Sequence, residues 1–332
     1  MPRQKRPTQE RTQPLRVVIT GASSGIGQAT AELLAKRGAR LVLAARNAEA
    51  LQTVAGRCEQ LGGEAICVPT DVTDSEAVRV LAERAAADLG GVDVWVSNAG
   101  TGAVGRYEET PMQSHEQVIR INLIGHMNDA HAVLPTFLRQ GHGIFINMIS
   151  LGGFAAAPFA AAYSAGKFGL RGFAEALRGE LAQYPDIHVC DVYPGFVDTP
   201  GLRHGANYVG RRISAPPPVL DARRVAEAIG RLCDKPRPTT VIGGSAVLTR
   251  VVHAANPVLT ARIAARLMQS YFDRAEPVAT SDGNLFDPSA DAAVIDGGLR
   301  KPARGIAAGT FAVGSLAAAA GALALARTKS HR

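Results

Sequence analysis

Cysteine, aromatic residues and paired histidines are all scarce in this sequence. Aromatic residues make up 5% of the chain, the eight histidines include no HxxxH or HExxH pair, and no CxxC motif occurs. These absences argue against a disulfide-stapled secreted scaffold and against a metal site. The four cysteines are therefore interpreted as reduced thiols of a cytosolic-type compartment, at positions Cys58, Cys67, Cys190 and Cys233.

Acidic residues are nearly absent from the two ends of the chain. The first 16 residues hold five Lys or Arg and only Glu10, and residues 300–332 hold six Lys or Arg and no acid. The formal charge of the whole chain is +7, so the body between these ends is slightly acidic. A nucleic-acid-binding face on the body is not expected. Residues 1–14 have no apolar stretch of the kind found in a secretory signal, and we expect a mobile basic arm there.

The central region alternates short apolar runs with longer helical patterns, which is typical of repeated βαβ units. The candidate strands are residues 16–20, 40–44, 64–69, 92–97, 143–149, 188–193 and 239–242. The candidate helices are residues 26–37, 47–61, 75–89, 114–139, 160–184 and 221–233. Continuous apolar strands fit a sheet covered on both faces by helices. The pattern predicts an α/β fold, a doubly wound parallel sheet of about seven strands.

The remainder of the chain predicts a C-terminal extension rather than a second catalytic domain. Residues 200–220 contain Gly201, Gly205, Gly210 and three consecutive prolines, which indicate a loop or lid. Residues 247–272 have a helical pattern, and 281–304 are rich in Gly, Asp and Pro, as in a linker or a wrapping tail. We therefore expect a catalytic domain at 15–250, a helical and linker extension at 251–304, and a basic tail at 327–332.

Residues 305–326 carry no charge over 22 residues, of which ten are Ala and four are Gly. A helix of this length would be about 33 Å long, just enough to cross a hydrocarbon core of roughly 30 Å. The high Ala and Gly content makes insertion marginal. A membrane anchor, an interfacial or packing helix and an unstructured tail all stay open. Basic residues flank the segment on both sides and give no orientation, and the catalytic domain is expected to be cytoplasmic, with or without an anchor.

A glycine-rich turn follows the first strand and opens the first helix. Its sequence is Thr20-Gly21-Ala22-Ser23-Ser24-Gly25-Ile26-Gly27. Glycines permit a tight turn and close approach of a pyrophosphate to the N–H groups at the start of the helix. The order of strand, glycines, hydroxyls and helix predicts a dinucleotide site.

This turn resembles the TGxxxGxG motif of the short-chain dehydrogenase/reductase family, and three later motifs extend the resemblance over about residues 15–245. They are Asp71-Val72, which in the family contacts the adenine; Asn98-Ala99-Gly100, which supports the sheet and cofactor; and Pro194-Gly195-Phe196-Val197-Asp198-Thr199, beside the nicotinamide. The resemblance implies a Rossmann fold with a nicotinamide cofactor. It also implies frequent homo-oligomers.

The end of the second strand selects between the two nicotinamide cofactors. An NAD site usually has an acid there, whereas Arg accommodates the 2′-phosphate of NADP. This strand ends in Arg46 with no acid beside it. Because a guanidinium pairs well with phosphate, we expect NADP(H).

Tyr163 and Lys167 are four residues apart in a helical pattern, so they share one face. With Ser150 and Asn122 they resemble the catalytic tetrad of the family. The resemblance implies that Tyr163 is the general acid or base and that Ser150 binds the substrate oxygen. Lys167 would hold the ribose and lower the pKa of Tyr163, and Asn122 would anchor a relay water. Asp93, Asp198, His126 and His131 are interpreted as structural or packing residues.

These features together predict an NADP(H)-dependent oxidoreductase that interconverts a ketone or aldehyde and an alcohol. We expect the substrate pocket to be lined by residues 151–159, Phe196 and the 200–220 loop. Phe154, Phe159, Leu202 and Val209 make that lining apolar and favour a hydrophobic substrate. Two alternatives remain, an inactive NADP-binding sensor or membrane scaffold, and an epimerase or dehydratase of the same superfamily.

Overall fold

The computed structural model describes residues 13–289 and 293–300 of the 332-residue chain. Seven parallel strands form one sheet in the order β11-β7-β6-β4-β1-β2-β3. Their bounds are β1 (Arg16–Thr20), β2 (Arg40–Ala45), β3 (Glu64–Pro69), β4 (Val94–Ser97), β6 (Gly143–Met148), β7 (Ile187–Pro194) and β11 (Thr239–Ile242). The order reverses beside β1, so the prediction of a doubly wound parallel sheet is confirmed.

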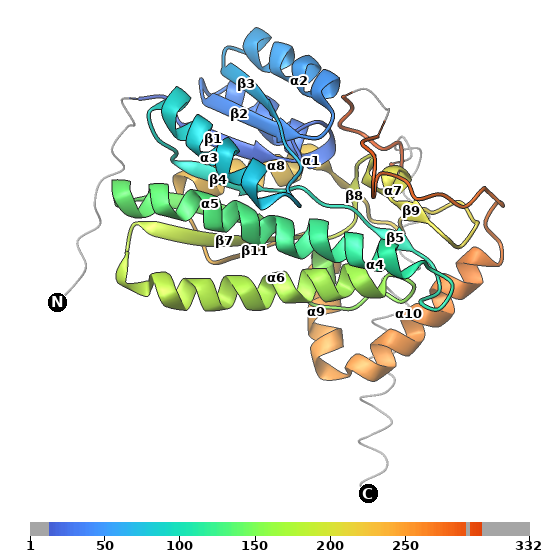
Figure 1. The fold of residues 1–332 in the computed structure, drawn as a ribbon. Helices are drawn as coiled ribbons and strands as arrows, with labels where there is room; N and C mark the ends of the chain where they lie inside the picture. The colour runs from blue at the N-terminus through green and yellow to red at the C-terminus, as the bar shows by residue number, and fades with distance from the viewer. Residues whose placement is uncertain (1–12, 290–292, 301–332) are drawn as a thin grey trace, which may run out of the picture.

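Helices cover both faces of this sheet (Figure 1). Apolar residues of α1, α2 and α8 pack on one face and those of α3, α5 and α6 on the other. The bounds are α1 (Gly25–Ala35), α2 (Ala48–Gln60), α3 (Ser75–Leu89), α5 (Gly125–Gln140), α6 (Ala161–Glu180) and α8 (Ala222–Asp234). Val18, Val42 and Trp95 are fully buried in register on adjacent strands. This double cover explains why the strands have continuous apolar sequences.

Two predicted helices are divided in the structure. The stretch predicted at 114–139 consists of α4 (Met112–Ile119), a π-helical turn (Arg120–Ile124) and α5. The stretch predicted at 247–272 consists of α9 (Gly244–Ala255) and α10 (Pro257–Phe272). Asn256 separates them because its side chain caps α10 by accepting the Leu259 N–H at 3.0 Å, while proline occupies the first position of α10.

The predicted loop at 200–220 contains short elements. Residues Gly201–His204 form α7, and β9 (Ala206–Asn207) pairs with β5 (Ala103–Val104). A second small sheet joins β8 (Val197–Asp198) to β10 (Leu220–Asp221). The β5–β9 and β8–β10 pairings fix the 200–220 segment along the carboxyl ends of the sheet strands. Elsewhere, short 3-10 turns occupy Leu151–Gly153 and Leu181–Gln183.

After α10 the chain returns across this edge of the molecule. We call residues 281–289 and 293–300 the strap. Figure 1 shows it in orange-red, running from α10 past β9 and α7 towards α2. Asn207 exchanges two backbone hydrogen bonds with Ser281 at the start of the strap, at 2.8 and 2.9 Å.

No helix within residues 13–289 and 293–300 is long and apolar enough to cross a membrane. The predicted basic arm lies almost wholly outside the described residues, and so do the apolar segment 305–326 and the basic tail.

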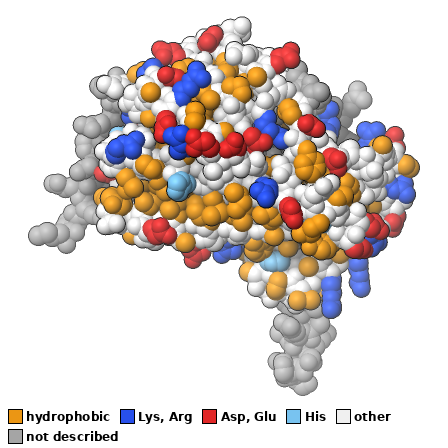
Figure 2. Space-filling model, in the orientation of Figure 1, with side chains coloured by type: hydrophobic (Ala, Val, Ile, Leu, Met, Phe, Trp, Pro, Cys, Tyr) orange, Lys and Arg blue, Asp and Glu red, His pale blue; other side chains and the backbone are white. Residues whose placement is uncertain are grey.

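An elongated apolar band is exposed over α5 and α6 (Figure 2), where Met127, Leu138 and Phe168 are each about two-fifths exposed.

Candidate active site

The glycine-rich turn links β1 to α1 in a conformation that requires glycine. Gly21 and Gly25 have φ angles of 66° and 54°, in the left-handed region that side chains rarely adopt. A Cβ on Gly27 would lie 2.1 Å from the carbonyl oxygen of Gly21. Ser24 makes no side-chain capping bond, which leaves first-turn N–H groups of α1 to partners from outside the helix. The turn thus has the shape and donors of a phosphate cradle.

The end of β4 is bonded directly to this turn. Asn98 donates through Nδ2 to the carbonyl oxygens of Thr20 at 3.2 Å and of Gly21 at 3.1 Å. The next residue, Ala99, accepts a 2.8 Å hydrogen bond at its carbonyl oxygen from the buried ring of His126. Burial and the neighbouring Lys167 lower the pKa of His126 to about 3, so the ring is neutral. These bonds place the Asn98-Ala99-Gly100 segment beside the turn, and His126 is an internal residue.

Asp129 is a buried residue of this region that the sequence patterns did not reveal. It lies on α5, and its Oδ2 accepts hydrogen bonds from the hydroxyls of Thr20 at 2.8 Å and Ser97 at 2.7 Å. These two residues end β1 and β4, immediately before the two turns. Burial raises the pKa of Asp129 to about 7, because the charged form is costly away from water. No motif marks this residue, since its partners are far away in sequence.

Ser150 and Tyr163 meet beyond the end of β6. Ser150 has a φ of 125°, a strained conformation for a residue with a side chain, and such strain is often retained where function needs it. Tyr163 lies in the first turn of α6. Burial raises the pKa of the phenol, and a hydrogen bond with the Ser150 side chain opposes that rise. At neutral pH the phenol therefore carries its proton next to the serine hydroxyl.

Lys167 follows one helical turn after Tyr163 and is 4% exposed. Its Nζ donates to the carbonyl oxygen of Met148 at 3.0 Å and lies 5.9 Å from the centre of the Tyr163 ring. Burial lowers the pKa of Lys167 to about 7. Desolvation thus lowers the pKa of the lysine and raises the pKa of the phenol, and in both cases it favours the neutral form.

Asn122 lies in the π-helical turn between α4 and α5 and is fully buried. Its Nδ2 donates to the carbonyl oxygens of Thr101 at 2.7 Å and Val118 at 3.0 Å, and its Oδ1 accepts the Thr101 N–H at 3.3 Å. A Cβ on Gly100 would lie 3.0 Å from Asn122 Oδ1 and 3.8 Å from Lys167 Nζ. Gly100 therefore lies between two of the predicted catalytic residues.

The remaining predicted cofactor residues lie along the same edge. Asp71 and Val72 follow β3, and Asp71 accepts hydrogen bonds from the N–H and hydroxyl of Thr73 at 2.9 and 2.8 Å. A Cβ on Gly25 would lie 3.1 Å from the Thr199 side chain. The turn and the segment after β7 are thus in contact, and that segment holds Pro194, Gly195, Val197 and Thr199.

Comparison with known proteins identifies this arrangement. The sequence profile of the short chain dehydrogenase family matches residues 16–206. The chain belongs to this family. Its sequence is 33% identical over 259 residues to the uncharacterized oxidoreductase YxnA of Bacillus subtilis, covering 76% of this chain and 72% of that protein. The chain is therefore an oxidoreductase of the short-chain dehydrogenase/reductase type.

Two solved short-chain dehydrogenase structures are similar to this fold. An alcohol dehydrogenase from the archaeon Thermococcus sibiricus, complexed with 5-hydroxy-NADP, is 28% identical with a TM-score of 0.61, covering 69% of this chain and 96% of that one. A short chain dehydrogenase/reductase from Burkholderia phymatum, in complex with NAD, is 25% identical with a TM-score of 0.67, covering 74% and 95%. Both forms of the dinucleotide thus occur among similar structures.

Arg46 makes contacts that the sequence did not predict. It ends the β2 region, but its guanidinium donates to backbone carbonyl oxygens of the strap. Nη1 donates to Leu285 at 3.3 Å and Phe286 at 3.1 Å, and Nη2 donates to Asn284 and, at 3.4 Å, to Asp287. The residue expected to read a 2′-phosphate is thus bonded to the returning chain.

The expected substrate lining needs one correction. Phe154 is only 7% exposed and stacks on Tyr193 with ring centres 4.1 Å apart, so it packs inside the domain rather than lining a pocket. Phe159 instead contacts Phe272 of α10 edge-on at 5.3 Å. Leu285 of the strap was not anticipated, yet it is fully buried in a cluster that includes Tyr163. The contacts of Phe159 with Phe272 and of Leu285 with the Tyr163 cluster join residues more than a hundred positions apart, which local patterns do not indicate.

Two of the acids interpreted as structural have defined partners. Asp93 forms an ion pair with Arg16 at 2.6 Å, and their hydrogen bonds hold the pKa of Asp93 below its usual range despite burial. Asp198 accepts the N–H groups of Gly297 at 3.0 Å and Leu299 at 2.8 Å. Despite burial, the hydrogen bond from Leu299 and those from Arg300 lower its pKa. Asp198 therefore anchors the far end of the strap.

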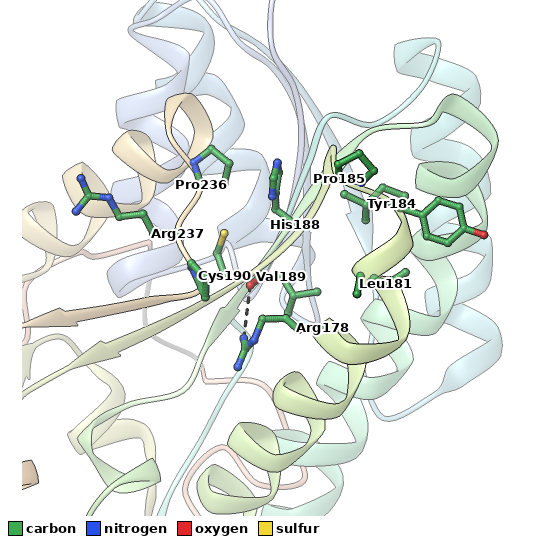
Figure 3. A pocket seen from close by; sticks show the side chains of 12 residues that line it. Arg178, Leu181, Tyr184, Pro185, His188, Val189, Cys190, Pro236 and Arg237 are labelled. Carbon is green, nitrogen blue, oxygen red and sulfur yellow. Dashed lines mark hydrogen bonds between the residues drawn. The ribbon is translucent and has the colours of Figure 1, made fainter. Parts of the chain in front are cut away.

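Among the cavities in the described part of the chain, two have volumes of about 240 Å³ each. One surrounds the first residues of β7, and Figure 3 shows Arg178, His188 and Arg237 around it. It is at the amino end of the strand, away from Tyr163 at the carboxyl edge. The other is lined by Phe159, which precedes α6, by Ala161, the first residue of α6, and by Ala265 of α10. Only this second cavity adjoins the start of α6.

Proposed function

We propose that the chain is an NADP(H)-dependent oxidoreductase that interconverts a ketone or aldehyde and an alcohol. The observation that carries the proposal is the meeting of Tyr163, Ser150 and Lys167 beside Gly100, at the edge where the glycine-rich turn lies. A nicotinamide dinucleotide fits this edge because the turn has no room for side chains and presents helix N–H groups. When bound, it supplies the hydride.

The residues that would hold the dinucleotide follow the edge of the sheet. The turn from Gly21 to Gly27 would hold the pyrophosphate, and Asp71 and Val72 the adenine. Arg46 would bind the 2′-phosphate, because a guanidinium fits phosphate with paired hydrogen bonds. Lys167 would hold the ribose, with the segments 98–100 and 194–199 on either side of the nicotinamide.

In the proposed reaction, Tyr163 gives its proton to the substrate oxygen during reduction and takes it back during oxidation. A phenol whose pKa is raised by burial is protonated at neutral pH, which is the state that the acid role needs. Ser150 donates a hydrogen bond to the same oxygen and stabilises the charge that develops there. Lys167 favours the phenolate when its ammonium is charged, and the π turn at Asn122 would hold a relay water.

An apolar substrate is supported by the surroundings of Tyr163. Its cluster consists of Ala103, Val118, Ala206 and Leu285, with Ala162 and Tyr208 packed against them. The cavity that adjoins the start of α6 is also lined by apolar residues, among them Phe159, Ala161 and Ala265, and apolar walls with a few polar groups are typical of pockets for small hydrophobic ligands. We also propose that copies of the chain associate through the apolar band on α5 and α6, because a contiguous apolar patch of this kind is costly to expose.

The deciding experiment measures NADPH oxidation by the purified protein with a panel of ketones and aldehydes of increasing hydrophobicity. Tyr163→Phe removes only the hydroxyl, and we expect the rate to fall about 10²- to 10⁴-fold. Tyr184→Phe is the matched control, since this half-exposed tyrosine lies at the opposite edge. Activity that survives Tyr163→Phe would refute the role of the phenol. Binding of NADPH with no turnover of any carbonyl would favour a sensor or scaffold instead.

A further inference from the structure

Carbonyl oxygens of the strap accept hydrogen bonds from the groups that would bind phosphate in the proposed dinucleotide site. The first part of the strap, residues 281–289, contacts two segments beside this site. Thr101, directly after the Asn98-Ala99-Gly100 segment, hydrogen-bonds through its hydroxyl to Asn284, and Asn47, at the start of α2, donates to the carbonyl oxygen of Ser289 at 2.9 Å. The strap therefore runs along the predicted cofactor edge, and does not merely extend from α10.

Arg46 has little capacity left while the strap is in place. A guanidinium has five N–H groups, four of them on its two terminal nitrogens. Both terminal nitrogens of Arg46 donate to strap carbonyls, two carbonyls each, within residues 284–287. A paired grip on phosphate needs two of these N–H groups, so phosphate and strap cannot both be fully bound by Arg46.

In the glycine-rich turn, too, a strap carbonyl occupies a donor that would bind phosphate. The N–H of Gly25, the first residue of α1, donates to the carbonyl oxygen of Val294 at 2.9 Å. N–H groups at a helix start are the donors that bind phosphate in such turns. Neutral carbonyl oxygens are weaker acceptors than a charged phosphate, which makes about twice as strong a hydrogen bond. A phosphate can therefore displace them.

The far end of the strap is held independently of these donors. Asp296 accepts hydrogen bonds from both terminal nitrogens of Arg223, each at 2.9 Å, and Arg300 forms an ion pair with Asp198 at 3.1 Å. Within the first part, the N–H of Asn284 donates to His204 at 2.7 Å and that of Leu285 to Asp282 at 3.2 Å. The ion pairs of Asp296 and Arg300 hold residues 293–300 close to the glycine-rich turn, where the Val294 carbonyl meets Gly25, and so favour the closed strap.

We propose that the strap is an intramolecular competitor of the cofactor, in which carbonyls of residues 284–287 occupy Arg46 until a 2′-phosphate takes their place. This inference rests on the proposed function in one respect, the binding of a 2′-phosphate by Arg46. It adds that cofactor binding and strap attachment oppose each other, so that the strap sets the affinity and selects for a dinucleotide that carries the 2′-phosphate.

Hydrogen exchange of the full chain tests the competition directly. The probes are adenosine 2′,5′-bisphosphate and 5′-AMP, which differ only in the 2′-phosphate, each at a concentration that saturates the protein. We expect the bisphosphate to speed exchange of residues 281–289 severalfold and 5′-AMP to leave it unchanged. In Arg46→Ala exchange should be fast without nucleotide and insensitive to both probes. Unchanged or slower exchange with bound bisphosphate would overturn the proposal, because the strap would then stay closed over the nucleotide.

A second measurement weakens the strap away from the site. Asp296→Asn removes the charge that pairs with Arg223, and the matched control Asp273→Asn changes an exposed acid at the end of α10. If the closed strap dominates, loosening it should lower the Kd for the bisphosphate about two- to fivefold. An unchanged or higher Kd in Asp296→Asn would contradict competition.

The strap and the proposed reaction can fail separately. Carbonyl reduction that depends on Tyr163, without either strap effect, would overturn only the competition. Both strap effects in a protein that turns over no carbonyl would overturn only the reaction. If neither nucleotide binds at any concentration tested, the 2′-phosphate site and the competition are both refuted.

Discussion

Asp129 offers a quantitative test of how the cofactor edge is held together. Its carboxyl group joins Thr20 and Ser97, the residues that end β1 and β4. Burial raises its pKa from 3.8 to about 7. In the unfolded chain the same group ionises near pH 3.9. Between about pH 4 and pH 7 the unfolded chain therefore releases a proton that the folded protein keeps.

The sign of the effect follows from this difference. A group with a raised pKa in the folded state contributes its stability below the unfolded pKa, and that contribution is lost as the pH rises to the folded pKa. Each pKa unit corresponds to about 1.4 kcal/mol, so the loss is on the order of 4 kcal/mol across the window and is constant above it. Asp129→Asn keeps the shape of the side chain and removes the titration.

The measurement is urea unfolding at pH 4.5 and pH 8, followed by the fluorescence of Trp95, the single tryptophan, which is fully buried. Between pH 4.5 and pH 8, we expect the free energy of unfolding to fall by about 3 kcal/mol more in the wild type than in Asp129→Asn. Asp88→Asn, an exposed acid on α3 that pairs with Arg84, is the control and should behave like the wild type. Equal pH dependence in wild type and Asp129→Asn would refute a raised pKa at this position.

Three further predictions concern the cofactor and the surface. Gly27→Ala places a methyl group 2.1 Å from the Gly21 carbonyl oxygen, so we expect NADPH binding measured by fluorescence to fall at least tenfold while the far-ultraviolet spectrum is kept. Arg46→Ala should reduce the NADPH preference over NADH in kcat/KM by about 10- to 100-fold, and an unchanged preference would remove Arg46 from the 2′-phosphate site. Phe168→Glu on the apolar band should lower the oligomeric state in sedimentation equilibrium, whereas Tyr107→Glu, which is more exposed than Phe168 but lies off the band, should not.

Local sequence patterns predicted the features that depend on neighbouring residues. The parallel sheet follows from apolar runs alternating with helical periods, and the glycine-rich turn follows from close contacts such as that of Gly27 with Gly21. Tyr163 and Lys167 share a helix face because they are four residues apart. The break at Asn256 also has a local signal, since Asn followed by Pro is a good start for a helix, but the apolar periodicity on both sides favoured one helix.

Contacts between distant parts of the chain were not predictable in the same way. Arg46 was assigned to phosphate because of its place after β2, yet its carbonyl partners are about 240 residues further along the chain. Every residue has a backbone carbonyl, so the residue types of the strap do not indicate which carbonyls Arg46 contacts. The same holds for the Val294 carbonyl on Gly25. Where main-chain oxygens replace a ligand's oxygens, the sequence predicts the donors, and only the folded chain shows what they bind.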